Sequence, residues 1–403
     1  MMKNKFFLFA CLALFALSSC EKGGDYIEFE DNVLMQRCLL LEDFNQDGKL
    51  SYDEAKNIES LNVNNLGIKS LNGIERLPNL KSLVISNNPI HSFVLRNNSQ
   101  LEGVLAENCP LHNIDLSGCI NLKRLVLSGA SLDHFDFSSF PNLSRIQFSS
   151  CGLKEMDLRN NTKLEELTLN NEQISSLNLS ANIALEKLSL YDLPVKNLDL
   201  SNNKNLTSLY ISGMQLDPIK YSLPLLHYVY IFNSSASLDL SDCPAVGYLK
   251  ISDSYLKSLV LNEIVSTLSI SNSTVDNFNH SRCVSLTQVS LDNTPIQKLD
   301  LSNTDESTIR STYNISINNC SLKEICFPKY KLKGFRIELK NNLLTEISLH
   351  VDTSYNVDNQ LKIKGENHLS TLYLNKDAFL YGITFERSSQ YISDNIEIIY
   401  FDE

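Results

Sequence analysis

The chain has 403 residues, of which 43% are hydrophobic and 20% are charged, and its formal net charge is −12. This composition is that of a folded chain with enough apolar residues for a sizeable core, and the length alone would suggest two or three domains. The acidic balance argues against the phosphate backbone of a nucleic acid as a partner.

The first predicted element is an export signal in residues 1–19. Two lysines precede an apolar run from Phe6 to Leu17, which is too short to span a bilayer as a mature helix. The run ends in the letters LSSC, which resemble the lipobox of bacterial lipoproteins. The resemblance implies that the signal is cut before Cys20 and that lipid is attached there, which would tether the chain outside the cytoplasm. The alternative is an ordinary secretory signal followed by a chance cysteine.

The next predicted element, within residues 20–57, is a helical cap built around the sequence DFNQDGKLSYDE. Oxygen-bearing residues alternate along it and a glycine permits a sharp turn, as a hard cation such as Ca²⁺ requires. The pattern resembles the EF-hand loop, which implies Ca²⁺ ligands at Asp43, Asn45, Asp47, Lys49 (through its carbonyl), Ser51 and Glu54. We expect a structural ion that holds two short helices over the first coil, with Leu34, Cys38 and Leu41 facing inward. A chance acidic turn is the alternative.

Residues 58–349 repeat the pattern LxxLxLxxxxLxxLDLSxxxx. Consecutive units of 21 residues begin at Leu80, Leu101, Leu122, Leu143 and Leu164. The repeats resemble the leucine-rich repeat family, in its short bacterial class. Both halves of each unit carry the period-2 spacing of a strand. We therefore predict a β-rich solenoid with an extended segment on each side of every coil and the small α-helical cap at its start.

Three further residue series recur in register with the repeats. We expect the amides of Asn79, Asn121, Asn142 and Asn205 to bond the turn backbone of neighbouring coils. The Asp of LDLS forms an outward row, interpreted as a solvated face with local turn hydrogen bonds, with binding of a cation or a basic partner as the alternative. Several cysteines fall at matching repeat positions, which favours buried free thiols over ligands or bridges. Residues 350–403 are predicted to hold irregular repeats and a terminal cap.

One predicted strand differs from the others on its outward side. The letters YVYIF place aromatic rings at alternating positions, and neighbouring coils add more. We predict an aromatic patch for partner binding, formed by Tyr191, Tyr210, Tyr228, Tyr230, Phe232 and Tyr248. The alternatives are an aromatic ladder that only stabilises the sheet and a surface covered by the C-terminal tail.

No catalytic motif emerges from the sequence, so we expect a protein that is not an enzyme. The hypothesis is a calcium-stabilised, lipid-anchored recognition protein that binds a protein partner through the face of its solenoid. A surface glycan-binding protein of a polysaccharide uptake system is the alternative, because flat aromatic rings also suit sugar stacking. The combination of lipobox, calcium loop and repeats resembles cell-envelope proteins of Bacteroides-type bacteria, which implies display on the outer membrane.

Overall fold

The computed structural model describes residues 26–308, 313–332, 334–352, 359–365, 367–375, 382–386 and 397–401. The chain divides into two compact units. Unit 1 comprises Met1–Leu132 with Ser139–Leu143, and unit 2 comprises Asp133–Ser138 with Ser144–Glu403. Among the described residues, no helix is long and apolar enough to cross a bilayer.

Each coil contains a strand in which buried and exposed side chains alternate. In β10 (Glu166–Asn170), Leu167 and Leu169 are buried and the residues beside them are partly exposed. Successive side chains of a strand point to opposite faces, so the L-x-L spacing sends both leucines inward. The parallel register pairs Leu167 with Leu188, its counterpart in the next coil. Leucines of successive coils therefore stack into a continuous core, and the predicted β-solenoid is confirmed.

Unit 1 starts with short elements and continues with coil strands. The short elements are β1 (Tyr26–Ile27), α2 (Asn32–Glu42), β2 (Leu50–Ser51), α3 (Tyr52–Ala55) and the 3₁₀ turn η1 (Ile74–Arg76). The coil strands form a parallel sheet made of β3 (Ser60–Asn62), β4 (Ser82–Val84), β6 (Gly103–Ala106) and β8 (Arg124–Ser128). The other side of the coils carries the parallel pair β5 (Ser92–Val94) and β7 (Asn113–Asp115).

The short helices are bonded to the first coil. Asp31 caps α2 by accepting from the amides of Val33 and Leu34, and its second oxygen accepts from the amide of Lys69 at 2.8 Å. Arg37 donates to the carbonyl of Asn62. Leu34 and Cys38 are fully buried, as predicted for the cap, whereas Leu41 is only partly buried. The helical cap is thus present, although its third expected anchor is partly exposed to solvent.

Unit 2 is built on a long parallel sheet, which we call the long sheet. Its first half comprises β9 (Arg145–Ser149), β10, β11 (Lys187–Tyr191), β12 (Ser208–Ser212), β14 (Tyr228–Phe232) and β16 (Tyr248–Ser252). Its second half comprises β18 (Thr267–Ser271), β20 (Gln288–Asp292), β22 (Tyr313–Asn318), β24 (Phe335–Lys340), β26 (Gln360–Lys364) and β28 (Gly382–Glu386).

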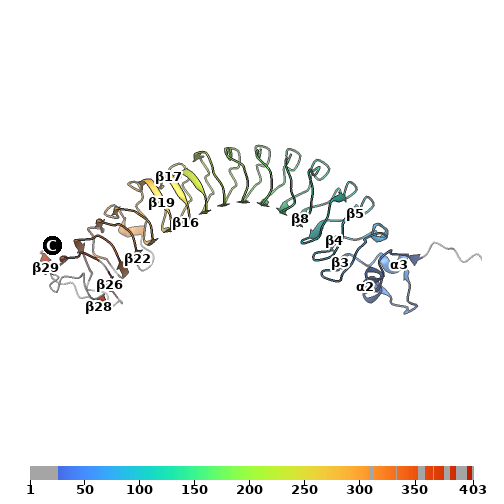
Figure 1. Cartoon of the computed structure of the whole chain (residues 1–403), viewed down its shortest axis with the longest axis horizontal. Coiled ribbons are helices and arrows are strands. Elements are labelled where there is room, and N and C mark those ends of the chain that lie inside the picture. Colours follow the sequence, from blue (N-terminus) through green and yellow to red (C-terminus); the bar gives the residue numbers. More distant parts are fainter. Residues whose placement is uncertain are drawn as a thin grey trace, which may run out of the picture. The chain divides into compact units, whose positions relative to one another are not determined.

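The opposite side of unit 2 carries shorter groups of strands, and Figure 1 shows β17 and β19 across the coils from β16. One group comprises β13 (Ile219–Lys220), β15 (Ser235–Asp239), β17 (Tyr255–Val260) and β19 (Thr274–Asn279). The strands β21 (Lys298–Asp300) and β23 (Glu324–Cys326) form a separate parallel pair, and the second 3₁₀ turn, η2 (Glu306–Thr308), lies between them in the sequence. The last group comprises β25 (Glu346–Leu349), β27 (Thr371–Asn375) and β29 (Glu397–Phe401).

The turn that leaves each long-sheet strand depends on one left-handed residue. Asn171, Asp253 and Asn272 have φ between 47° and 53°, a region in which Asn, Asp and Gly are favoured. The side chains at this position bond to one another, as in the contact from Asn272 Nδ2 to Asp253 Oδ1 at 3.1 Å. Gly213 occupies the same position, where a Cβ would lie 1.7 Å from Asp192 Oδ1. The turn therefore requires both the backbone conformation and a fit between neighbouring coils.

Amide side chains join successive coils in two ladders. The predicted ladder, which lies at the surface, is confirmed: Asn121, Asn142 and Asn205 each donate to a backbone carbonyl of the preceding coil, and Asn79 donates to the carbonyl of Lys56 at the end of the cap. A second, buried ladder was not predicted: Asn182 donates to the carbonyls of Leu158 and Asn161, at 3.0 and 2.9 Å. These bonds satisfy polar backbone atoms that the tight coil would otherwise leave unpaired.

The cysteines of the described residues are free, as expected. All but Cys326 are buried. Cys119 fills a position of the buried ladder, and its thiol donates to the carbonyl of Leu95. Burial raises the pKa of the Cys38 and Cys119 thiols to about 12, so both remain protonated at neutral pH and pack as small apolar groups.

Candidate binding surface on the long sheet of unit 2

The aromatic patch lies on four neighbouring strands of the long sheet: β11, β12, β14 and β16. The parallel register puts Tyr210 beside Tyr230 and Tyr228 beside Tyr248. The intervening Val229 and Ile231 are fully buried, so the alternation of the strand turns the aromatic rings outward. The sequence spacing and the 4.7–4.9 Å separation of strands together explain why the rings meet.

The rings of the patch are in contact with one another. Tyr210 and Tyr230 are stacked, with centroids 4.3 Å apart and planes 5° from parallel. Tyr230 also lies 5.5 Å from Tyr248 and 6.2 Å from Phe232. Tyr228 is the most accessible member, with 48% of its surface exposed. Five of the six predicted residues thus form one cluster, held by a sheet that fixes their spacing.

The sixth predicted residue lies apart from the cluster. Tyr191 is in register with Ser212, and Ser212 is in register with Phe232. A small serine therefore separates the two rings, at a distance of about two strand spacings. Tyr191 belongs to the rim of the surface.

Charged side chains border the aromatic patch on two sides. Lys250 lies over the ring of Phe232, with its Nζ 5.9 Å from the centroid. Burial raises the pKa of Tyr230, and its contact with the Tyr210 hydroxyl raises it further, so the phenol stays protonated and can donate a hydrogen bond. On the side toward β9, Glu166 bridges Arg145 and Lys187 at 2.5 and 2.8 Å. The surface therefore offers apolar rings with hydroxyl donors, bordered by Lys250 on one side and by an ion-paired group of two cations and one carboxylate on the other.

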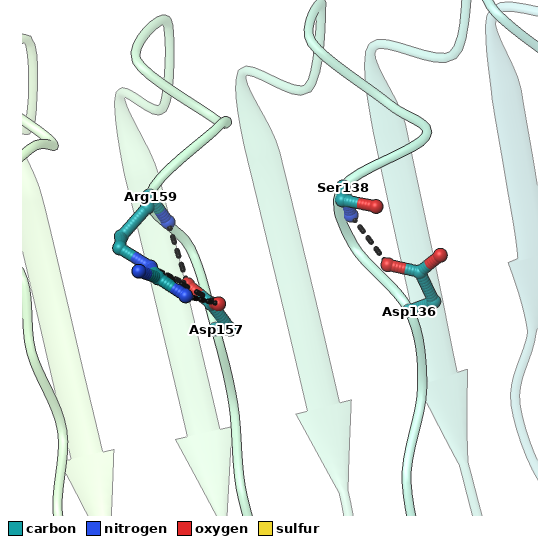
Figure 2. A network of polar contacts seen from close by, with 4 residues as sticks. All are labelled: Asp136, Ser138, Asp157 and Arg159. Carbon is teal, nitrogen blue, oxygen red and sulfur yellow. Dashed lines mark hydrogen bonds and ion pairs between the residues drawn. The ribbon is translucent and has the colours of Figure 1, made fainter.

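The row of aspartates on the other side of the coils serves the local turn. Figure 2 shows Asp136 accepting from the amide of Ser138 at 2.9 Å, and Asp157 accepting from the amide and guanidinium of Arg159. Hydrogen bonds from Arg159 lower the pKa of Asp157 to about 2. Asn178 makes the same turn contact, with the amide of Ser180. Because the amide oxygen of Asn178 makes the same contact as the carboxylate of Asp157, this position requires a hydrogen-bond acceptor and does not require a charge.

The predicted calcium loop is folded as a chain of side-chain-to-backbone turns. Asp43 accepts from the amide of Gly48 at 3.1 Å, and Asp47 accepts from the amide of Lys49. The exit helix α3 starts with a capping box, in which Ser51 and Glu54 bond each other reciprocally. Hydrogen bonds from Ser51 lower the pKa of Glu54, so this side chain is a carboxylate at neutral pH.

The oxygen donors of this loop suit a hard cation, because carboxylate, amide and carbonyl oxygens are the ligands that Ca²⁺ takes. One oxygen of Asp43 is buried and has no hydrogen-bond partner. Asn45 is turned toward Asp47, at 3.2 Å. Within the described ranges, no three His, Cys, Asp or Glu side chains form a metal-binding group. The loop thus has the required donors, and ion binding stays a prediction. Cys20, the predicted lipid site, lies outside the described residues.

Unit 1 exposes an apolar row that the sequence reasoning missed. Val84, Leu105 and Val126 are neighbours in the register of β4, β6 and β8, at positions that face outward in other coils. Val84 and Leu105 are partly exposed. The signal was present in the sequence, as an apolar residue between the two inward apolar residues of three successive repeats, where most other repeats carry a polar residue.

Comparison with known proteins supports the fold. The family described as the endo-beta-N-acetylglucosaminidase EndoS LRR domain matches residues 36–151. The functional domain of InlJ from Listeria monocytogenes, described as including a cysteine ladder, is 21% identical with a TM-score of 0.57, over 81% of this chain and 71% of that one. An internalin, InlF, from Listeria monocytogenes str. 4b F2365 is 20% identical with a TM-score of 0.50, over 79% and 91%. No curated protein matches the sequence.

Proposed function

We propose that this leucine-rich repeat protein is a recognition protein without enzymatic activity, which binds a protein partner through the long sheet of unit 2. The observation that carries the proposal is the contact cluster of Tyr210, Tyr228, Tyr230, Phe232 and Tyr248 on a rigid parallel sheet. Tyrosine contributes large apolar contact area and a hydrogen-bond donor while losing little rotamer entropy. Residues of this type dominate the binding energy of protein interfaces.

A site-specific photocrosslinker tests the proposal. With p-benzoylphenylalanine in place of Tyr230, irradiation in the native host should yield a covalent adduct with one protein. The matched control places the same crosslinker at Tyr255, an exposed tyrosine of β17 on the opposite side of the coils. Adducts of the same protein from both positions, or from neither, would contradict the proposal.

Truncating side chains of the patch measures their contribution to the free energy of partner binding. The double substitution Tyr228→Ala and Tyr230→Ala should weaken partner binding by roughly 30-fold for each side chain and by up to about 1,000-fold together, because each buried aromatic anchor contributes about 2 kcal/mol. Tyr255→Ala is the control and should leave affinity unchanged. Unchanged affinity in the double variant would eliminate the patch as the binding centre.

A surface glycan is the second candidate partner. The nearly parallel stack of Tyr210 and Tyr230 presents flat rings, and Ser189 of β11 lies beside Tyr210 in the strand register. Flat rings beside hydroxyl groups suit a sugar, which has an apolar face and polar edges. Binding on a glycan array that is lost in the Tyr228→Ala and Tyr230→Ala variant, without a protein adduct in the crosslinking experiment, would favour this candidate.

We further propose that Ca²⁺ stabilises the helical cap through Asp43, Asn45, Asp47, Lys49, Ser51 and Glu54. A ligand that binds only the folded state stabilises it in proportion to the logarithm of its concentration. Chelation should therefore lower the melting temperature of the wild-type chain and leave that of Glu54→Gln unchanged. Equal melting temperatures of wild type and Glu54→Gln in excess Ca²⁺ would refute a stabilising ion.

Lipid attachment at Cys20 and display on the outer membrane complete the proposal. The support is the sequence of the export signal and its LSSC ending. Mass spectrometry of the N-terminal peptide should find a mature chain that begins at a lipidated Cys20. Cys20→Ser should release the chain from the membrane fraction, and a variant that remains there would contradict the anchor.

A further inference from the structure

The outward positions of the long sheet differ in charge from the rest of the chain. The chain as a whole carries a net charge of −12. The outward cations of this sheet are Arg145, Lys187, Lys250, Arg336, Lys340, Lys362 and Lys364. The acidic residues at equivalent positions are fewer, namely Glu166, Asp292, Glu338 and, in the backbone register of β28, Glu386. An acidic protein thus has one face with an excess of positive charge.

Four of these cations lie together on the adjacent strands β24 and β26. We call them the basic cluster: Arg336, Lys340, Lys362 and Lys364. Glu338 lies among them, and its closest ion-pair distance is 3.6 Å, to Lys364. Within the described residues, Arg336, Lys340 and Lys362 have no carboxylate within ion-pair distance. Near β10, by contrast, a single glutamate forms ion pairs with two cations.

The register brings the cations of the two strands together. Lys340 lies directly opposite Lys364, and Glu338 lies directly opposite Lys362. Because Lys364 is paired with Glu338, the cations left for a partner are Arg336, Lys340 and Lys362, which have no carboxylate within ion-pair distance among the described residues. A bound anion would form charge-assisted contacts with these three groups. The cluster therefore has the properties of a surface that meets an acidic partner.

The position of the cluster relates it to the aromatic patch. Four strand spacings separate β16 from β24, which is about 19 Å. The outward residues of the strands between them are small or polar, such as Ser269, Ser290 and Ser316. A partner can therefore lie flat across this stretch. A standard interface buries about 800 Å² on each side, which is wide enough to cover both surfaces.

We propose that the partner bound by the long sheet is an acidic protein, whose Asp and Glu side chains contact the basic cluster while an apolar part covers the aromatic patch. The contact with the aromatic patch rests on the proposed function, whereas the contact with the basic cluster rests on the charge distribution of the long sheet. A protein fits better than a nucleic acid, because the cluster is small and the remainder of the chain repels phosphate. We expect the basic cluster to affect the association rate and its salt dependence more than the affinity for the partner.

The experiment uses the full chain and a fluorescent poly-L-glutamate peptide as the probe. Fluorescence anisotropy should show binding at low salt that weakens as ionic strength rises. The variant Arg336→Glu with Lys362→Glu should weaken binding at least tenfold. The control is Lys196→Glu with Lys257→Glu, which changes net charge equally at exposed positions outside the long sheet. This control should bind like the wild type, and circular dichroism should show that both variants are folded.

The possible outcomes separate this inference from the proposed function. Absence of poly-L-glutamate binding, or equal losses in the two charge variants, would overturn the acidic partner and leave the crosslinking test of the patch unaffected. Binding of dextran sulfate without binding of poly-L-glutamate would also overturn it and indicate a sulfated glycan. Binding that persists in Tyr228→Ala with Tyr230→Ala but disappears in the basic-cluster variant would support it.

Discussion

At the residue scale, each turn of a coil requires one property of its side chain: tolerance of positive φ at one turn and a hydrogen-bond acceptor at the other. The left-handed turn holds Asn, Asp or Gly in most coils because each tolerates positive φ, and Ser150 after β9 is an exception. The row on the other side accepts Asp or Asn because each has an oxygen that bonds the amide two residues later. The abundance of these residues in the sequence therefore reflects backbone geometry, repeated once per coil.

Asp157 provides a pH test of this interpretation. Its folded-state pKa is about 2, below the usual value of 3.8, so its stabilising contribution is present above pH 4 and is lost as pH falls toward 2. Asp157→Asn keeps the acceptor and removes the titration, as Asn178 does in the next coil. The difference in melting temperature between wild type and Asp157→Asn should be small at pH 7 and should shrink further from pH 4 to pH 2.

The comparison variant is Asp157→Ala, which removes the acceptor altogether. It should melt below Asp157→Asn at every pH, because the amide of Arg159 loses its partner. Equal melting temperatures of the two variants would show that the turn contact does not stabilise the coil.

At the element scale, successive coils are joined by core leucines and by amide ladders. The two ladders use the same side chain in different surroundings. Asn182 is fully buried and bonds two carbonyls, whereas Asn205 is exposed and bonds one, the carbonyl of Ile183. A hydrogen bond in a buried site costs more to remove, because water cannot replace the lost partner.

The two asparagines therefore form a matched pair for mutation. Asn182→Ala should lower the free energy of unfolding by about 1–3 kcal/mol, and Asn205→Ala by less than about 1 kcal/mol. Denaturant titration of both variants measures the difference. Equal losses would contradict the importance of burial, and a negligible loss in Asn182→Ala would assign the stability of the stack to the leucines alone.

At the scale of the whole molecule, each coil of unit 2 pairs only with the coils before and after it. The register connects β11 with β10 and β12, and no pairing connects it with later strands of the described sheet. Stability in such a stack is approximately a sum of coil terms and nearest-neighbour terms. A defect in one coil should therefore have its main effect nearby.

Leu188→Ala tests this locality. Leu188 is fully buried in β11, and its truncation should cost about 2–5 kcal/mol. Hydrogen exchange should show the largest loss of amide protection in β10, β11 and β12, with little change in β22 and β24. A uniform loss across unit 2 would instead show that the stack unfolds as a single cooperative unit.

The sequence was most informative where one pattern repeats in every coil. The L-x-L spacing predicted the strands, their inward leucines and their stacking, because the period-2 alternation and the 21-residue period leave one way to bury all the leucines. The same periodicity predicted the aromatic cluster and the exposed asparagine ladder. The cap at Asp31–Ala55 was predicted from its own local signals, namely a capping aspartate and an alternation of oxygen ligands.

The buried ladder, the apolar row of unit 1 and the basic cluster became apparent only in the structure. Each depends on which residues lie side by side across strands that are 19 to 26 positions apart in the chain. Lys340 and Lys364, for example, belong to irregular repeats whose register cannot be counted from a fixed period. The sequence by itself determined the coil, because hydrophobic spacing is local. The tertiary structure decided which outward side chains form one surface, because hydrogen bonding between strands sets their register.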